Sequence, residues 1–135
     1  MTTASATEYA DSIAAGITER TNSGYPFGVK DVNTDEWFTD YGEAVEQGVE
    51  ESDITEASGI DYLSDVLDIQ YIVSGDRQYR AARILIAFGG PTAWINTLTG
   101  QVEAAWWSET VYRDLPRGFV EEIDNALEEL WEMGA

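Results

Sequence analysis

Acidic side chains are concentrated in two segments of this chain, and this uneven charge is the feature that most constrains its fold. Residues 31–68 hold thirteen Asp and Glu residues and no Lys or Arg, and residues 119–135 hold six acids and no base. Carboxylates at helical spacing repel one another, and no base within 31–68 offsets that repulsion locally. The segment between, residues 69–118, is nearly neutral and apolar. The pattern predicts a neutral sheet flanked by two strongly negative surfaces.

The composition excludes several classes of function. The 135 residues include no His and no Cys, so the chain lacks the side chains for a Ser-His-Asp or Cys-His site, a zinc finger or a disulfide. A net charge of −19 disfavours direct binding to nucleic acid or to an anionic membrane, because both need positive charge on the protein. Carboxylate pairs are too abundant here to indicate a catalytic centre. We therefore expect a protein that is not an enzyme, needs no cofactor and binds a basic partner.

The chain has the composition of a folded protein. Hydrophobic residues make up 44% and aromatic residues 12%, which disordered acidic tails do not reach. The length predicts a single domain over residues 1–135. Residues 1–7 lack the basic and apolar regions of a secretory signal, and no apolar stretch is long enough to span a bilayer. We expect a cytoplasmic protein.

Apolar periodicity and strand-like runs predict an α+β fold. The predicted helices cover residues 5–20, 35–50, 59–67 and 117–133. The predicted strands cover residues 68–74, 78–88, 93–97 and 101–107. Short connections between consecutive strands favour an antiparallel meander. The expected architecture is a four-stranded antiparallel meander, with an N-terminal group of acidic helices and a C-terminal helix packed on it.

Capping residues indicate where two of these helices begin. Thr34 is the expected N-cap of the helix over 35–50. Ser58, with Asp61 three residues later, resembles a capping box that starts the helix over 59–67. The residues of this last helix that we expect to face inward are Ile60, Leu63 and Leu67.

The predicted helix over 35–50 carries the main functional hypothesis. Four of its acids fall on one outward stripe, at spacings of four, three and seven: Glu36, Asp40, Glu43 and Glu50. Residues four apart on a helix lie about 6 Å apart along its axis, close to the spacing of phosphates on a nucleic-acid strand. Such a stripe can occupy a basic DNA-binding groove, guided there by electrostatic attraction. The predicted partner-binding residues are Asp35, Glu36, Asp40, Glu43, Glu46, Glu50, Glu51, Asp53 and Glu56, with Glu121, Glu128 and Glu132 as a second contact line.

The acidity is also compatible with roles that involve no mimicry of nucleic acid. A solvated acidic face without a partner, or an acidic binding or structural module of a salt-adapted or mobile-element protein, would show the same charge. Glu outnumbers Asp and the acids are clustered, and both features argue against salt adaptation. Asp31, Asn33 and Asp35 match the first ligand positions of a calcium-binding EF-hand loop, but Glu36 and Gly42 replace the residues required at positions six and twelve.

Three Trp and three Arg residues of the neutral segment have structural interpretations. Trp94, Trp106 and Trp107 lie on predicted strands, and core packing explains all three most simply, whereas an exposed one would be a candidate interface anchor. The basic side chains that we expect to pair with the acidic helices are Arg77, Arg80 and Arg83.

The C-terminal half resembles a group of known proteins. The resemblance lies in residues 84–97 (ILIAFGGPTAWINT), 100–107 (GQVEAAWW) and 123–131 (IDNALEELW), and it covers about residues 60–133. These stretches are similar to small acidic proteins of phages and conjugative elements, some of which act as anti-CRISPR or anti-restriction proteins. The resemblance implies a DNA-mimic inhibitor of a CRISPR effector or restriction enzyme in the host cell. Its Gly, Pro and Trp residues belong to the scaffold, so they do not identify the target.

Overall fold

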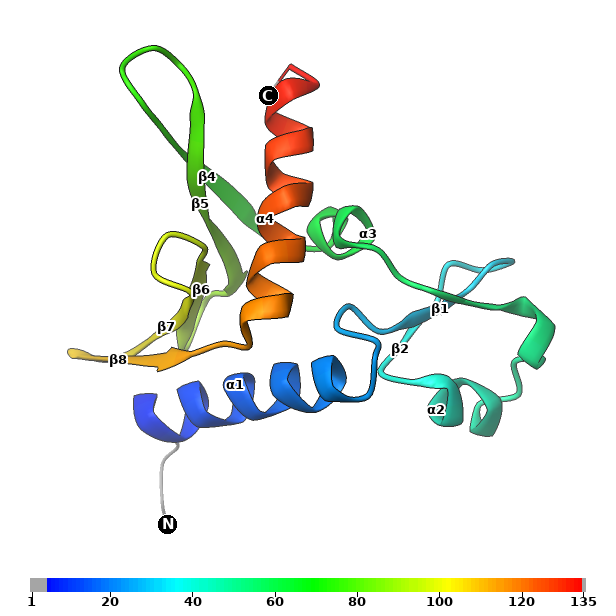
Figure 1. Cartoon of the computed structure of the whole chain (residues 1–135). Coiled ribbons are helices and arrows are strands. Elements are labelled where there is room, and N and C mark those ends of the chain that lie inside the picture. Colours follow the sequence, from blue (N-terminus) through cyan, green and yellow to red (C-terminus); the bar gives the residue numbers. More distant parts are fainter. Residues whose placement is uncertain (1–4, 135) are drawn as a thin grey trace.

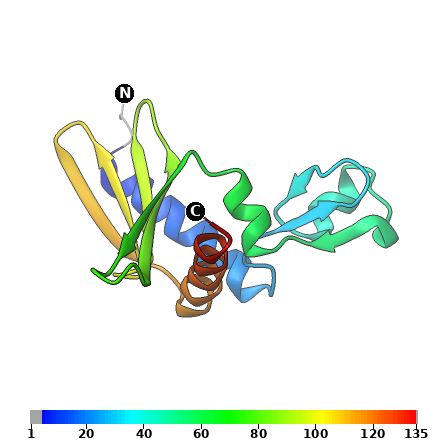
Figure 2. The same cartoon turned by 90° about the horizontal axis from the view of Figure 1, so that it is seen from above.

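The computed structural model describes residues 5–134 and shows two lobes of different size (Figure 1). The larger lobe contains α1 (Ala6–Asn22), α3 (Gly59–Ser64), β4 (Asp68–Val73), β5 (Tyr79–Ala87), β6 (Thr92–Asn96), β7 (Gln101–Trp106), β8 (Glu109–Asp114) and α4 (Arg117–Glu132). The smaller lobe contains β1 (Val29–Asp31), β2 (Trp37–Phe38), α2 (Tyr41–Glu46), the 3-10 turn η1 (Glu51–Asp53) and β3 (Ile54–Glu56). It projects beyond α3 and the C-terminal end of α1, away from the large sheet (Figure 2).

The larger lobe is built on a five-stranded antiparallel sheet with strand order β4-β5-β6-β7-β8. This confirms the α+β class and the meander, but the sheet has one strand more than the predicted four. The additional strand is β8, which pairs with β7 through contacts such as Ala104 opposite Val111. The sequence does not reveal it because Trp107 and Ser108 form the turn before it. Neither is Gly, Asn or Asp, the residues by which two-residue hairpin turns are recognised.

Helices cover one face of the large sheet. Ile84, Ile95 and Val102 lie side by side on β5, β6 and β7, and all three are fully buried. They pack in one hydrophobic cluster with residues of α1, α3 and α4, which include Ile17, Leu63, Phe119, Ile123 and Leu127. This confirms the predicted packing of the C-terminal helix on the meander (Figure 2).

The opposite face of the sheet is open and polar. Trp94 and Glu103 are paired across β6 and β7, and the guanidinium of Arg83 lies 4.4 Å from the centroid of the Trp94 ring. Arg83 also donates a hydrogen bond from Nε to Glu103, at 2.9 Å. The prediction that all three Trp residues of the meander are core residues is therefore wrong. Trp94 and Trp106 are half-buried and Trp107 is 88% exposed.

Three of the four predicted helices are present near their expected bounds. α1 and α4 begin and end within two residues of the prediction. α3 begins with the predicted capping box, in which Ser58 Oγ accepts from the Asp61 N–H and the Asp61 carboxylate accepts from the Ser58 N–H. It ends at Ser64, however, so Leu67 lies outside it and is 60% exposed. Of the three residues predicted to face inward, only Leu63 is buried, because Ile60 is also exposed.

The predicted helix over 35–50 is wrong. Its first residues form β2, which pairs with β1 through Trp37 opposite Lys30, and only Tyr41–Glu46 are helical. The expected N-cap Thr34 instead accepts a hydrogen bond from the Glu36 N–H within the turn between β1 and β2. A long helix would align like charges with no base between them, whereas a hairpin and a short helix place the same carboxylates on separate elements.

A second, smaller hydrophobic cluster holds the smaller lobe together. Val29, Phe38, Ala44 and Ile54 are buried there, one from each of β1, β2, α2 and β3. The three-stranded sheet, with strand order β2-β1-β3, supplies the backbone pairing. Among the helices of residues 5–134, none combines the length and hydrophobicity that a bilayer-spanning segment needs.

The aromatic contact between α4 and the chain entering the smaller lobe predicts a large stability effect. Phe119 is fully buried, with its ring centroid 5.3 Å from that of Phe27 and 6.0 Å from that of Tyr62. Phe119→Ala should lower the free energy of unfolding by about 3–5 kcal/mol. Leu98→Ala is the control, because Leu98 is 64% exposed and should change it by less than about 0.5 kcal/mol. Urea denaturation measures both, and equal effects would contradict this view of the core.

Candidate acidic interface

All nine predicted partner-binding acids between residues 35 and 56 lie on the smaller lobe, but they do not form one helical stripe. Two precede β2 (Asp35 and Glu36), three cap or belong to α2 (Asp40, Glu43 and Glu46), three flank or form η1 (Glu50, Glu51 and Asp53), and one ends β3 (Glu56). Eight are exposed, and Asp53 is half-buried. The predicted match to phosphates along a helix axis is therefore wrong, and the acids form a negative surface distributed over several short elements instead.

None of these nine acids has a basic partner among the described residues. Four ion pairs form within residues 5–134: Lys30–Asp61, Arg83–Glu103, Arg113–Asp11 and Arg117–Glu121. The prediction that the strand arginines pair with the acidic helices is therefore wrong, since Arg83 pairs with a neighbouring strand instead. Lys30 attracts Asp35 without forming an ion pair with it. Most of the negative field of the smaller lobe is therefore left without local compensation among the described residues, which is the condition for long-range attraction of a basic surface.

Two of the nine acids have a structural role. The Asp40 carboxylate accepts a hydrogen bond from the Glu43 N–H at 2.8 Å, and the Glu43 carboxylate accepts one from the Thr39 N–H at 2.9 Å. These bonds satisfy backbone donors at the start of α2, where negative charge is also favourable. Asp40 and Glu43 therefore stabilise the lobe whether or not they also contact a partner.

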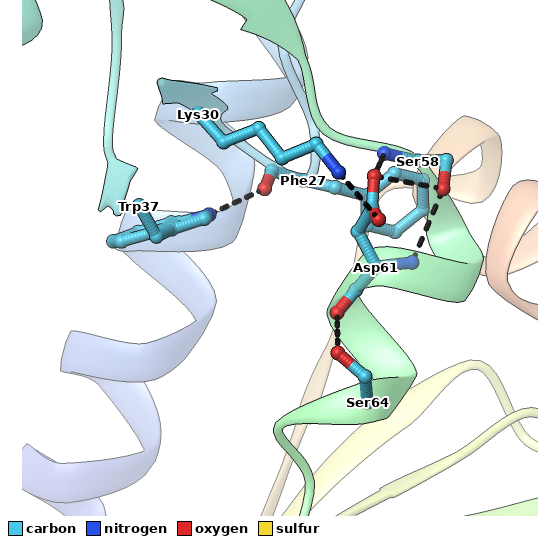
Figure 3. Close-up of polar contacts among 6 residues, drawn as sticks. All are labelled: Phe27, Lys30, Trp37, Ser58, Asp61 and Ser64. Carbon is cyan, nitrogen blue, oxygen red and sulfur yellow. Dashed lines mark hydrogen bonds and ion pairs between the residues drawn. The ribbon is translucent and has the colours of Figure 1, made fainter. Parts of the chain in front are cut away.

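Lys30, the only Lys of the chain, connects the smaller lobe to α3 (Figure 3). Its Nζ lies 2.9 Å from Asp61 Oδ1, while Asp61 Oδ2 accepts from the Ser58 N–H at 2.8 Å. A second connection is made by Trp37, whose ring N–H donates to the Phe27 carbonyl at 2.7 Å. One base thus fixes the position of a lobe that is otherwise acidic, and it is used for structure rather than for neutralising the exposed acids.

The same contacts shift the pKa of both partners. Burial by itself would raise the pKa of Asp61, but hydrogen bonds from Ser58 and Lys30 outweigh it and hold that pKa below its usual value. The hydrogen bond to Asp61 raises the pKa of Lys30. Both shifts favour the charged forms, as expected for an ion pair reinforced by a helix cap.

The segment that resembles a calcium loop forms a tight turn. The Asp31 carboxylate accepts a hydrogen bond from the Asn33 N–H at 2.8 Å, and the Asp35 N–H donates to the Asp31 carbonyl at 2.8 Å. Asp35 has a φ of 61°, which allows the chain to reverse between β1 and β2. Within residues 5–134, no group of three or more acids is placed to hold a metal ion.

The second acidic block lies on α4 and meets the first across a groove. The groove has a volume of about 500 Å³, with Glu56 from the smaller lobe on one side and Glu122 and Glu129 of α4 on the other. The sequence hypothesis placed the contact line at Glu121, Glu128 and Glu132, so it missed the two α4 acids that face the groove. Their spacing of seven residues, which places them on one face of a helix, was the available signal.

The predicted acids of α4 differ in their surroundings. Glu121 and Glu132 are exposed, and Glu121 accepts a hydrogen bond from Arg117 Nε at 2.8 Å. Glu128 is half-buried, near Tyr79 of β5. Burial raises the pKa of Tyr79, and the hydrogen bond that its hydroxyl donates to Asp124 at 2.6 Å adds to the increase. This side of α4 is therefore occupied by its contact with the sheet.

Comparison of the chain with protein-family models, curated proteins and solved structures gives no match. The geometry of the acidic surface is therefore the main support for a function.

The Lys30–Asp61 pair predicts a pH-dependent stability effect. Because the pKa of Asp61 is lower in the folded state, the charged form stabilises the fold at neutral pH, and this contribution is lost as the pH falls through that pKa. Asp61→Asn should lower the free energy of unfolding at pH 7 by about 1 kcal/mol, mainly by weakening the helix cap. Denaturation from pH 7 to pH 3 should show the difference between wild type and variant shrinking. A difference in the free energy of unfolding that stays constant with pH would contradict a stabilising role of the ionised Asp61 carboxylate.

Proposed function

We propose that this protein is a DNA-mimic inhibitor that binds the basic DNA-binding groove of a host defence enzyme, a CRISPR effector or restriction enzyme, in the cytoplasm. The observation that carries the proposal is the smaller lobe, on which eight exposed carboxylates have no basic partner among the described residues. The lobe is folded and fixed to α3, so the charges are presented on a defined surface. Preorganised negative charge is what a groove built for phosphates attracts.

The placement of the lobe supports the same proposal. It projects from the larger lobe, so a partner can approach it without contacting the large sheet (Figure 2). The groove bounded by Glu56, Glu122 and Glu129 continues the negative surface onto α4. In a DNA-binding groove, basic side chains normally contact the phosphates of both DNA strands. When this protein occupies the groove, those side chains can therefore contact carboxylates from both acidic blocks of the sequence.

Charge reversal on the smaller lobe tests the proposal. Replacement of Glu46, Glu50 and Glu51 by Lys leaves the Asp40–Glu43 cap of α2 intact, because none of the three accepts a side-chain hydrogen bond within the described structure. Inhibition of DNA cleavage by purified Cas9–guide complexes and restriction enzymes should fall at least tenfold for each enzyme that the wild type inhibits. Each Lys removes attractive contacts and adds repulsion to the basic groove.

A matched variant carries the same change in net charge elsewhere. Glu8, Glu19 and Glu109 are exposed acids of the larger lobe, and their replacement by Lys should leave inhibition within about twofold. Circular dichroism and thermal melting confirm folding of both variants. Equal loss of inhibition in the two would show that net charge, rather than the lobe, is responsible. Full inhibition by the folded lobe variant would refute the proposal.

Salt dependence separates mimicry from salt adaptation. The two hydrophobic clusters hold the fold, so we expect the protein to stay folded at low salt and to bind its target most tightly there, since screening weakens attraction between opposite charges. Thermal melting and inhibition assays between about 20 and 500 mM NaCl measure both quantities. Unfolding at the low-salt end would instead indicate a salt-adapted protein whose charge serves solubility.

A further inference from the structure

Large apolar side chains are exposed at one end of the large sheet. Phe88, in the turn between β5 and β6, is 76% exposed, and Trp107, in the turn between β7 and β8, is 88% exposed. Both turns lie at the same end of the meander (Figure 2). Trp106 connects them, because its ring is 6.0 Å from that of Trp107 and lies against Gly90 of the other turn. We call Phe88, Trp106 and Trp107 the aromatic end.

The backbone at Trp107 is unfavourable for a tryptophan. Its φ is 59°, in the left-handed region that glycine adopts readily and other residues enter at an energetic cost. A glycine would close the turn between β7 and β8 more easily, so the turn does not require this side chain. Trp107 also remains 88% exposed despite its contact with the Trp106 ring, so packing within the chain does not account for it either.

The aromatic end carries little charge, with the exposed Glu109 opposite Trp106 at the start of β8. Between residues 84 and 108 the only charged residue is Glu103, which is paired with Arg83 at 2.9 Å. The smaller lobe lies at the far side of the molecule from these turns (Figure 2). Two copies with a net charge of −19 each repel one another in most orientations. The repulsion is weakest when their aromatic ends face one another, because the acidic lobes are then far apart.

We propose that the aromatic end binds the aromatic end of a second copy, forming a twofold symmetric dimer that keeps the acidic lobes away from the interface. A covered aromatic side chain buries about 150–250 Å². Phe88 and Trp107 from both copies therefore bury roughly 600–1,000 Å², and Trp106 adds to this, which approaches the total of about 1,000–1,200 Å² for the smallest specific interfaces. A twofold symmetric interface uses the same patch on both copies, and a patch of aromatic side chains can pack against an identical patch.

Sedimentation equilibrium of the purified protein tests the dimer. We expect dimerisation to strengthen between about 50 and 500 mM NaCl, because salt screens repulsion between the two copies. Trp107→Gly should raise the dimer dissociation constant at least tenfold while the thermal midpoint stays the same or rises, since glycine suits the backbone at this position. Phe88→Ser is a second variant that should also weaken the dimer.

Leu98→Ser is the matched control, because Leu98 is a 64% exposed apolar residue in the turn at the opposite end of the same sheet. It should leave the dissociation constant within about twofold. A wild-type protein that stays monomeric up to about 200 μM in 500 mM NaCl would overturn the proposal. So would a Trp107→Gly variant that dimerises like wild type, or an equal effect of Leu98→Ser.

Discussion

Repulsion between carboxylates is the constraint on which the rest of this structure depends. Residues 31–68 contain no base, and Lys30, the only Lys of the chain, lies immediately before them. Lys30 pairs with Asp61, which also caps α3, so one ion pair fixes the smaller lobe to the larger one. The other acids of the lobe are distributed over short elements around a small apolar cluster and do not lie along one continuous helix.

The larger lobe holds most of the hydrophobic core, and the smaller lobe carries the surface proposed to bind a partner. Phe27 belongs to the large cluster and Val29 to the small one, so the chain passes from one core to the other within two residues. The larger lobe supplies most of the buried apolar surface. This burial can offset the repulsion between the carboxylates of the smaller lobe. This arrangement allows a strongly negative surface to exist without basic residues that would neutralise it, and the proposed mimicry of DNA depends on that property.

The two proposed interactions differ in their response to salt. Binding of the acidic lobe to a basic groove weakens as salt rises, whereas contact between two aromatic ends strengthens because like charges are screened. They also use opposite ends of the molecule (Figure 2). A dimer would therefore present two acidic lobes at once, and each lobe could bind a separate basic groove without competing with the self-contact.

The sequence by itself determined the α+β class, the meander, the bounds of α1 and α4, and the capping box at Ser58, because these depend on local periodicity and on short-range hydrogen bonds. It also located the acids of the proposed interface. It could not decide the conformation of residues 35–50, since pairing of β2 with β1 is a contact between segments and outweighs helical spacing. Only the tertiary structure decided that Glu56 faces Glu122 across a groove and that Trp107 is exposed. Both facts depend on how elements that are distant in sequence pack against one another, and the residues next to Glu56, Glu122 and Trp107 in the sequence do not determine that packing.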